Sequence, residues 1–172
     1  ATTDAKNNMT PIPDTNNPQL LIDTFYARCN EITQIVSRVH SAKASIVTHW
    51  DAEKRGLHVR ACSGVEGNDY SVGQFIPYDE QLHCFRVLEF SKPVCIVNTL
   101  LKEGNDVREI SYMGTPLHTQ EGPFGTLCVI EGNPVQNSKQ TEQTMAKFKE
   151  ILEGDLALLL YKDISIAHSA LW

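Results

Sequence analysis

Hydrophobic positions divide the chain into two amphipathic ends and a middle section with β-type patterning. After Asn17 and Pro18, apolar residues recur every three or four positions, which is typical of one buried helical face. The same spacing returns after Ser138, a residue type that caps helices. We therefore predict helices over residues 18–40 and 138–161.

Between these helices, short runs rich in Val, Ile, Thr, Tyr and Phe predict strands. Residues 44–50 and 57–62 form a first hairpin around a polar connection that ends in Gly56. Residues 111–131 form a second, central hairpin whose turn lies at residues 118–123. The two hairpins predict that an antiparallel sheet is the centre of the fold.

A short helix and weaker strand signals lie between the hairpins. Asp79 is a suitable cap for a helix that ends before Lys92-Pro93, because the residue before a proline disfavours helical backbone. We predict short strands at residues 72–76 and 94–97, and a loop or single helical turn at residues 102–109. The order helix, hairpin, helix, central hairpin, helix indicates an α+β fold.

Length and composition favour one domain. The chain has 172 residues, of which 41% are apolar, and this is enough for one sizeable core. Residues 1–17 are rich in Asn, Thr, Asp and Pro and lack periodicity, so we predict a disordered leader or linker there. Residues 18–172 are predicted to form a single domain that includes both terminal helices.

Charge and hydropathy exclude two classes of partner. The net charge is −6 and no basic run is present to neutralise phosphates, so nucleic acid is not expected. The longest strongly apolar run, residues 156–161, is too short for a membrane span, and the polar N-terminus is unlike a signal peptide. Five cysteines without a CxxC motif are typical of free thiols, and we expect a cytoplasmic protein.

Three segments resemble, in the same order, signature motifs of bacterial GAF domains, which are sensory modules that hold a small molecule between a sheet and covering loops. Residues 84–94 are similar to C-x-x-V-L-x-x-x-x-P, residues 112–117 to Y-x-G-x-P-L, and residues 124–131 to x-G-T-L-C-V-I-D, with Glu131 in place of the usual Asp. The resemblance covers residues 44–161. It implies a central antiparallel sheet of about five to six strands. The first and last helices would pack on one face, and a ligand pocket would lie on the other.

The same resemblance places the pocket lining on the loop and helix over residues 70–87 and on inward positions of the central hairpin. Aromatic rings with polar tips are typical of small-molecule sites, although packing in the core is an alternative reading of each residue. The expected ligand-binding residues are Tyr70, Phe75, Tyr78, His83, Cys84, Val87, Tyr112, Thr126 and Cys128.

Catalytic and cofactor chemistry has little support in the sequence. His83 and Cys84 are adjacent on a predicted helix, so their side chains point about 100° apart and cannot act as base and nucleophile. Bilin-binding GAF domains have the order Cys-His, which is reversed here. The Asn-Lys-x-x-Phe-Asp-Glu motif of cyclic-nucleotide-binding GAF domains is absent. We predict no catalytic residue and leave the cofactor unidentified.

A redox enzyme remains an alternative. Free methionine sulfoxide reductases are GAF-type enzymes in which several cysteines meet near the pocket, but their local pattern is not present in this chain. The other reading of the cysteines is that they are small buried hydrophobic residues. The cysteines concerned are Cys62, Cys84, Cys95 and Cys128.

Metal binding is not predicted. The histidines are scattered, and none has a recognised ligand spacing to a Cys, Asp or Glu. Residues 64–67 contain two glycines but neither the P-loop lysine nor the dinucleotide-binding spacing. The six histidines are His40, His49, His58, His83, His118 and His168.

The terminal helices indicate how such a module would act. Residues 156–161 are apolar almost all round, so this stretch needs a partner on more than one face, either within the monomer or in a homodimer. The GAF resemblance implies relay through the end helices to an output domain such as a histidine kinase or a diguanylate cyclase. Because the chain begins at Ala1 and ends in apolar residues, we expect a module from a longer chain. The predicted function is small-molecule sensing, and a module that only dimerises is a further alternative.

Overall fold

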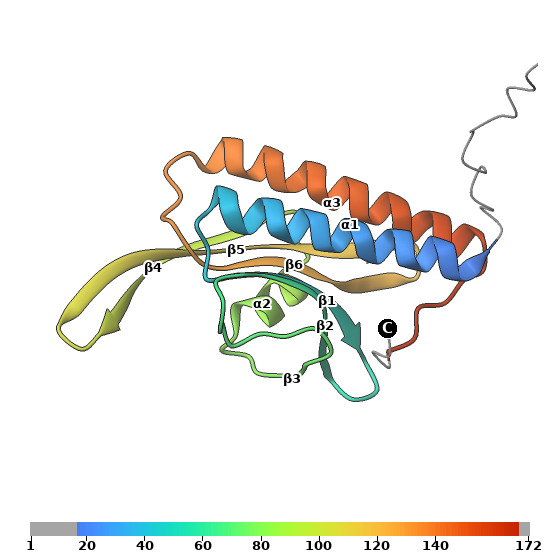
Figure 1. The fold of residues 1–172 in the computed structure, drawn as a ribbon, viewed down its shortest axis with the longest axis horizontal. Coiled ribbons are helices and arrows are strands. Elements are labelled where there is room, and N and C mark those ends of the chain that lie inside the picture. The colour runs from blue at the N-terminus through green and yellow to red at the C-terminus, as the bar shows by residue number, and fades with distance from the viewer. Residues whose placement is uncertain (1–16, 169–172) are drawn as a thin grey trace, which may run out of the picture.

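Six antiparallel strands form the centre of the fold, and helices cover both faces (Figure 1). The computed structural model describes residues 17–168, so the leader or linker predicted at residues 1–17 lies, apart from Asn17, outside the described residues. The strand order is β3-β2-β1-β6-β5-β4. This architecture confirms the predicted α+β fold with a central antiparallel sheet of five to six strands. The elements are α1 (Pro18–Val39), β1 (Ala44–Asp51), β2 (Gly56–Gly64), β3 (Phe75–Pro77), α2 (His83–Phe90), β4 (Cys95–Glu103), β5 (Asp106–Thr119), β6 (Gly122–Gly132) and α3 (Ser138–Tyr161).

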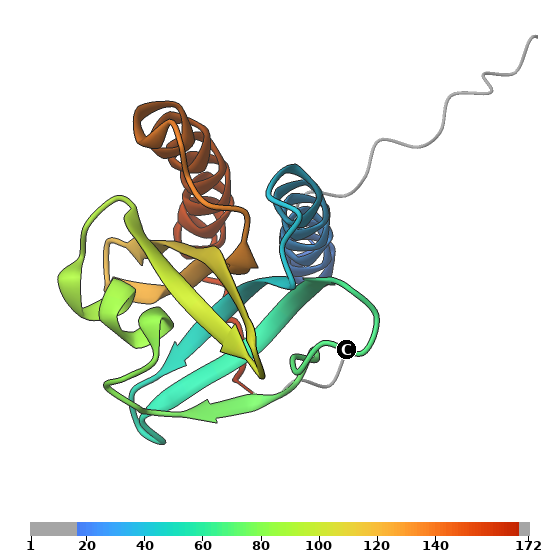
Figure 2. The same ribbon diagram turned by 90° about the vertical axis from the view of Figure 1, so that its left-hand side faces the viewer.

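The two terminal helices lie side by side on one face of the sheet, and α2 lies on the other, as Figure 2 shows. The predicted helical spacing explains this placement, because it gathers apolar side chains into one stripe on each helix. Phe25 and Cys29 of α1 and Met145 and Leu152 of α3 are buried against the sheet. An ion pair of 3.3 Å between Arg28 and Asp155 links the two helices.

The observed helix cap agrees with the sequence-based prediction at α1 and differs from it at α2 and α3. The Asn17 side chain accepts a hydrogen bond from Gln19 N, as expected for the start of α1. The cap of α3 is Asn137 and not Ser138, since the Asn137 side chain accepts from Gln140 N. The predicted cap Asp79 lies before α2 in a turn of its own, and α2 starts at His83 without a side-chain cap.

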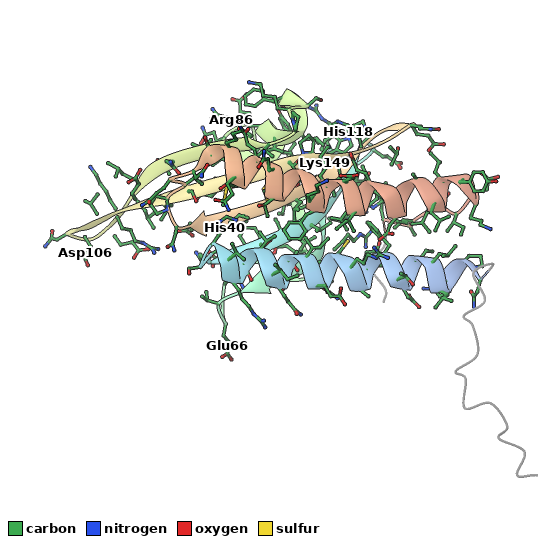
Figure 3. The ribbon with its side chains drawn as sticks, turned by 90° about the horizontal axis from the view of Figure 1, so that it is seen from above. His40, Glu66, Arg86, Asp106, His118 and Lys149 are labelled. Atoms are coloured by element: carbon green, nitrogen blue, oxygen red, sulfur yellow. The ribbon has the colours of Figure 1, made fainter. Side chains whose placement is uncertain are left out.

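A polar cluster fixes α3 to β5. Lys149 of α3 donates hydrogen bonds to the carbonyl of Pro116 and to the Glu153 carboxylate, and Glu153 accepts from the backbone N–H of His118. Figure 3 shows Lys149 and His118 together above the sheet. Charged groups at the edge of the apolar interface therefore set the position of α3 along β5.

The prediction of a loop or helical turn at residues 102–109 is wrong. β4 and β5 continue through this segment as a paired hairpin that ends in the turn between Glu103 and Asp106. Figure 3 shows Asp106 at the far tip of this arm. Because no helix covers the arm, both of its faces carry polar residues and the alternation that marks a half-buried strand is lost. The strand predicted at residues 72–76 also differs from the structure, in which β3 spans Phe75–Pro77.

A missing side chain on β5 brings α2 close to the sheet. A Cβ added to Gly114 would lie 2.6 Å from Val87 Cγ2 of α2 and 3.4 Å from Cys128 Sγ. Any side chain at this position would therefore push α2 outward. Gly114 fixes the distance between α2 and the strands beneath it.

We predict that Gly114→Ala lowers the free energy of unfolding by about 1–3 kcal/mol, because the added methyl overpacks the contact with Val87. Urea denaturation measures the change. Gly154→Ala is the matched control, since Gly154 lies exposed on α3 with no atom within 4 Å of the added Cβ. It is expected to stabilise the protein by up to about 1 kcal/mol. Equal effects of the two substitutions would contradict the close packing of α2.

Candidate ligand-binding site

The face of the sheet opposite the terminal helices carries its own apolar cluster. Its floor consists of alternate residues of the central strands, including Ile46, Val59 and Ile130, all of which are buried. The loop after β2 and the first turn of α2 cover this floor. The side chains that pack against it are Cys62, Tyr70, Ile76, Cys84 and Tyr112.

Aromatic rings form one wall of the cluster. The His83 imidazole lies 4.4 Å from the Tyr112 ring, centre to centre, and its buried Nδ1 has no hydrogen-bond partner among the described residues. Burial, reinforced by the nearby Arg86, lowers the pKa of His83. Burial also raises the pKa of Tyr70 to about 12. The wall therefore presents a neutral imidazole and neutral phenols at physiological pH.

Polar side chains continue the cluster across the centre of the sheet. Cys128 Sγ donates to Thr126 Oγ1 over 3.3 Å, and the Thr126 and Thr48 hydroxyls lie 2.6 Å apart. Thr48 Oγ1 also accepts from the Thr126 backbone N–H. A hydrogen bond with Cys128, together with burial, raises the pKa of Cys84 well above its usual value. Cys84 is therefore a protonated thiol and a weak nucleophile.

A small cavity lies between α2 and strands β4, β5 and β6. Its volume is about 10 Å3, room for about one water molecule. Cys84, Cys95 and Cys128 line it together with His83 and Tyr112. A larger ligand can enter only if α2 or the preceding loop moves away from the sheet.

Most of the predicted site residues meet in this region. Tyr70, Cys84, Tyr112 and Cys128 share the apolar cluster, and Thr126 bonds to Cys128. His83 and Val87 line the cavity from α2. The remaining two predicted residues lie elsewhere.

Phe75 and Tyr78 are separated from the cluster. Phe75 pairs with His58 across β3 and β2, and the two rings lie 5.0 Å apart, on the face of the sheet that the cluster does not use. The Tyr78 hydroxyl donates to Glu89, and its ring lies beside Phe85 and Arg55. The sequence could not separate these aromatic residues because strand register decides which face each one joins.

A group of histidines was not anticipated. His49 and His58 pair directly across the β1–β2 hairpin, and His58 Nε2 lies 2.9 Å from Asp51 Oδ2. His168 reaches the same place from the segment after α3 and lies 4.3 Å from His49, ring centre to ring centre. The register of the predicted hairpin could have indicated that His49 and His58 lie opposite each other. Nothing in the sequence indicated that His168 would join them.

Across residues 17–168, no three His, Cys, Asp or Glu side chains converge in a way that could hold a metal ion. Within the same range, no helix combines the length and the apolar character needed to cross a bilayer.

We predict that the Thr48 and Thr126 hydroxyls stabilise the β1–β6 pairing jointly. Thr48→Val and Thr126→Val should each lower the free energy of unfolding by about 1–3 kcal/mol, since each leaves a buried polar partner unsatisfied. The double variant should lose less than the sum of the two, as a double-mutant cycle by urea denaturation would measure. Exposed Thr24→Val is the control, with an expected change within about 0.5 kcal/mol. Strictly additive losses would contradict the coupling.

No protein-family model matches the sequence, and no curated protein matches it. Solved structures do match in fold. The GAF domain of an Acinetobacter phosphoenolpyruvate-protein phosphotransferase has a TM-score of 0.59 and 15% identity, over 84% of this chain and 92% of that one. The phycoerythrobilin-bound GAF domain of a cyanobacterial phytochrome has a TM-score of 0.58 and 15% identity, over 86% and 98%.

A third similar structure is the chromophore-binding domain of an unusual bacteriophytochrome from R. palustris, with a TM-score of 0.61 and 12% identity. The match covers 84% of this chain and 61% of that domain, so the chain spans about three fifths of its length. At these identities the likeness concerns fold. Together with the six-stranded sheet and the helices on its two faces, it establishes that the chain has the fold of GAF domains.

Proposed function

We propose that this chain is a small-molecule-sensing domain of a bacterial signal-transduction protein. The supporting observation is the cluster between α2 and the sheet, where aromatic rings, thiols and a hydrogen-bonded threonine pair surround a small cavity. The buried Nδ1 of His83 lacks a partner among the described residues and is available to a ligand. The ligand contacts are Tyr70, His83, Cys84, Val87, Tyr112, Thr126 and Cys128.

The proposed ligand is small and carries a hydrogen-bonding group on an apolar body. The neutral imidazole and the protonated Cys84 thiol offer no charge to an ionic ligand, and the apolar floor favours aromatic or aliphatic groups. A bilin is disfavoured because the Cys-His order is reversed, and entry of any ligand larger than one water molecule requires α2 or the preceding loop to move away from the sheet.

Signal transfer from the site follows the alternation of side chains along β5. Tyr112 and Gly114 face α2, whereas Met113 and Leu117 belong to the core beneath the terminal helices. A ligand that displaces α2 therefore changes the strand on which α3 rests. The ligand shifts the helices only by the difference between its affinities for the two arrangements. The proposed output, a histidine kinase or a diguanylate cyclase, belongs to a longer cytoplasmic parent chain.

Native mass spectrometry of the purified protein, repeated after denaturation, tests the proposal. We expect an additional mass that is lost on denaturation. In Tyr112→Ala, the fraction of the protein that carries this mass should fall further than the lower stability of the variant explains. Phe75→Ala is the matched control, since it removes an aromatic ring outside the cluster and should retain the mass. A bare protein at every concentration, with no saturable binding of small aromatic compounds, would favour a module that binds nothing.

A redox enzyme is a second candidate because Cys84, Cys95 and Cys128 line one cavity. The raised pKa of Cys84 weighs against this thiol as the nucleophile, since the thiolate is the reactive form. The hydrogen bond with Cys84 lowers the pKa of Cys128, which makes Cys128 the better candidate nucleophile of the pair. Reduction of free methionine sulfoxide by the native protein, lost in Cys84→Ser or Cys128→Ser, would support this candidate. No activity in the native protein would exclude it.

We also propose that the terminal helices form a homodimer. Their outer surfaces expose apolar side chains that the sheet does not cover, including Ile35 of α1 and Leu158 of α3. Leu158→Glu should raise the dissociation constant of the dimer at least about tenfold, because it places a charge in the apolar contact. Sedimentation equilibrium measures the constant. Leu100→Glu, at an exposed apolar position on the arm, should leave it unchanged, and a native chain that stays monomeric would contradict the proposal.

A further inference from the structure

The chain turns back onto the sheet after α3. Asp163 has a φ of 60°, a left-handed conformation that is unusual outside glycine and ends the helix sharply. Figure 1 shows the following segment running down beside the sheet, away from the terminal helices. Ile164 and Ile166 pack against the main core. We call residues 163–168 the C-terminal strap.

A buried arginine holds the end of the strap. Ala61 and Val59 pair with consecutive residues of β1, so Arg60 between them occupies a β-bulge, a feature that redirects a side chain. Arg60 Nη2 donates to the backbone carbonyls of Ala167 and His168, each over 2.6 Å. Charge-assisted hydrogen bonds of this kind fix the strap above β2.

Three imidazoles meet where the strap crosses the hairpin. The His168 ring lies 4.3 Å from His49 and 5.5 Å from His58, and is nearly parallel to His58. His49 itself stacks on Phe124, is 7% exposed, and has a buried Nδ1 without a hydrogen-bond partner among the described residues. A proton on His49 would therefore be desolvated and would face other cationic groups.

Packing beneath the strap is incomplete. A cavity of about 350 Å3 separates residues 163–166 from the end of α3 and the β5–β6 turn, and His49 forms part of its wall. The strap is therefore held by a few contacts at its end and by two isoleucines, which is typical of segments that open locally without global unfolding.

We propose that the C-terminal strap is a pH-sensitive latch, which docks over neutral His49 and is released when His49 is protonated. The proposal concerns the helix-covered face and is independent of the ligand site below α2. Release would free the chain that leaves α3 and expose the Arg60 and histidine surface.

The sign of the effect follows from linkage. In the docked state, burial lowers the pKa of His49 from 6.5 to about 3, with further contributions from His168, Arg60 and His58. Docking is therefore at full strength above pH 6.5 and weakens as the pH falls below it. If release restores the ordinary value, the His49 contribution alone lowers the docking constant about 30-fold between about pH 7.5 and about pH 5.

Other charged groups surround His49 and shape the response. Asp51 attracts a proton to His49, but hydrogen bonds from His58 and from Lys54 N lower the pKa of Asp51 to about 2, so its charge is constant in this range. Tyr26 of α1 lies near Arg60, and its pKa is raised by burial. Glu121 and Asp163 border the cavity. Asp51 Oδ2 also lies 3.6 Å from His168 Nδ1 of the strap, so a proton on His168 strengthens this contact and opposes the effect of a proton on His49.

The first test is the titration of the His49 ring protons by NMR in the native protein and in Ile164→Asn/Ile166→Asn, which weakens the strap without adding charge. The His49 midpoint should rise toward 6.5 in the variant. His40 is an internal control, since burial lowers its pKa at the far end of α1 and its midpoint should not move. An unchanged His49 midpoint in a folded variant would overturn the proposal.

A second test leaves the sequence of the C-terminal strap unaltered. Amide exchange at Ile164, whose N–H donates to the Leu159 carbonyl over 2.9 Å, should accelerate by up to about 30-fold between about pH 7.5 and about pH 5 after division by the intrinsic rate at each pH. His49→Phe keeps the stacking on Phe124, removes the titrating group and should abolish the acceleration. Val107→Asn on the exposed arm should behave like the native protein. The same acceleration in His49→Phe would overturn the proposal, whether or not the isoleucine variant folds.

Discussion

The pairing of β1 with β6 is the constraint on which the rest of the structure depends. It joins α1 and β1–β3 to β4–β6 and α3, two parts of the chain that otherwise form their own hairpins. A Cβ at Gly125 would lie 1.8 Å from the Thr48 carbonyl oxygen, so the strands meet closely only because this residue is glycine. The same seam carries Cys128 toward the ligand cluster and Phe124 toward His49.

Apolar spacing made much of this architecture predictable. Phe25 and Cys29 on α1, and Met145 and Leu152 on α3, have the spacing of one helical face and are buried as that spacing requires. Gly114, which lies in one of the GAF-like motifs, is a glycine for a steric reason that the structure reveals, because Val87 of α2 packs directly against it. Each of these patterns lies within a short segment of the sequence. The need to bury one face of that segment is enough to determine the helix or strand it forms.

Other features depend on partners that are distant in sequence. Phe75 and Tyr112 look alike in the sequence, yet cross-strand pairing places Phe75 beside His58, whereas Tyr112 packs against His83 of α2. His168 joins the histidine group through contacts of the returning chain, above all the hydrogen bonds from Arg60 to the Ala167 and His168 carbonyls. The cavity volume is likewise a property of packing, since it depends on how closely Val87 approaches Gly114. Residue type alone determines none of these.

The two outer strands of the sheet differ in what they offer to another polypeptide. β3 has three residues and ends in Pro77, which lacks the N–H needed to extend the ladder. β4 is nine residues long, and its outward backbone edge carries no further strand among residues 17–168. Lys102 and Glu103 place charges near its tip, a feature that discourages edge-to-edge aggregation. Any growth of the sheet by strand addition would therefore start on the uncharged half of β4, beside Cys95.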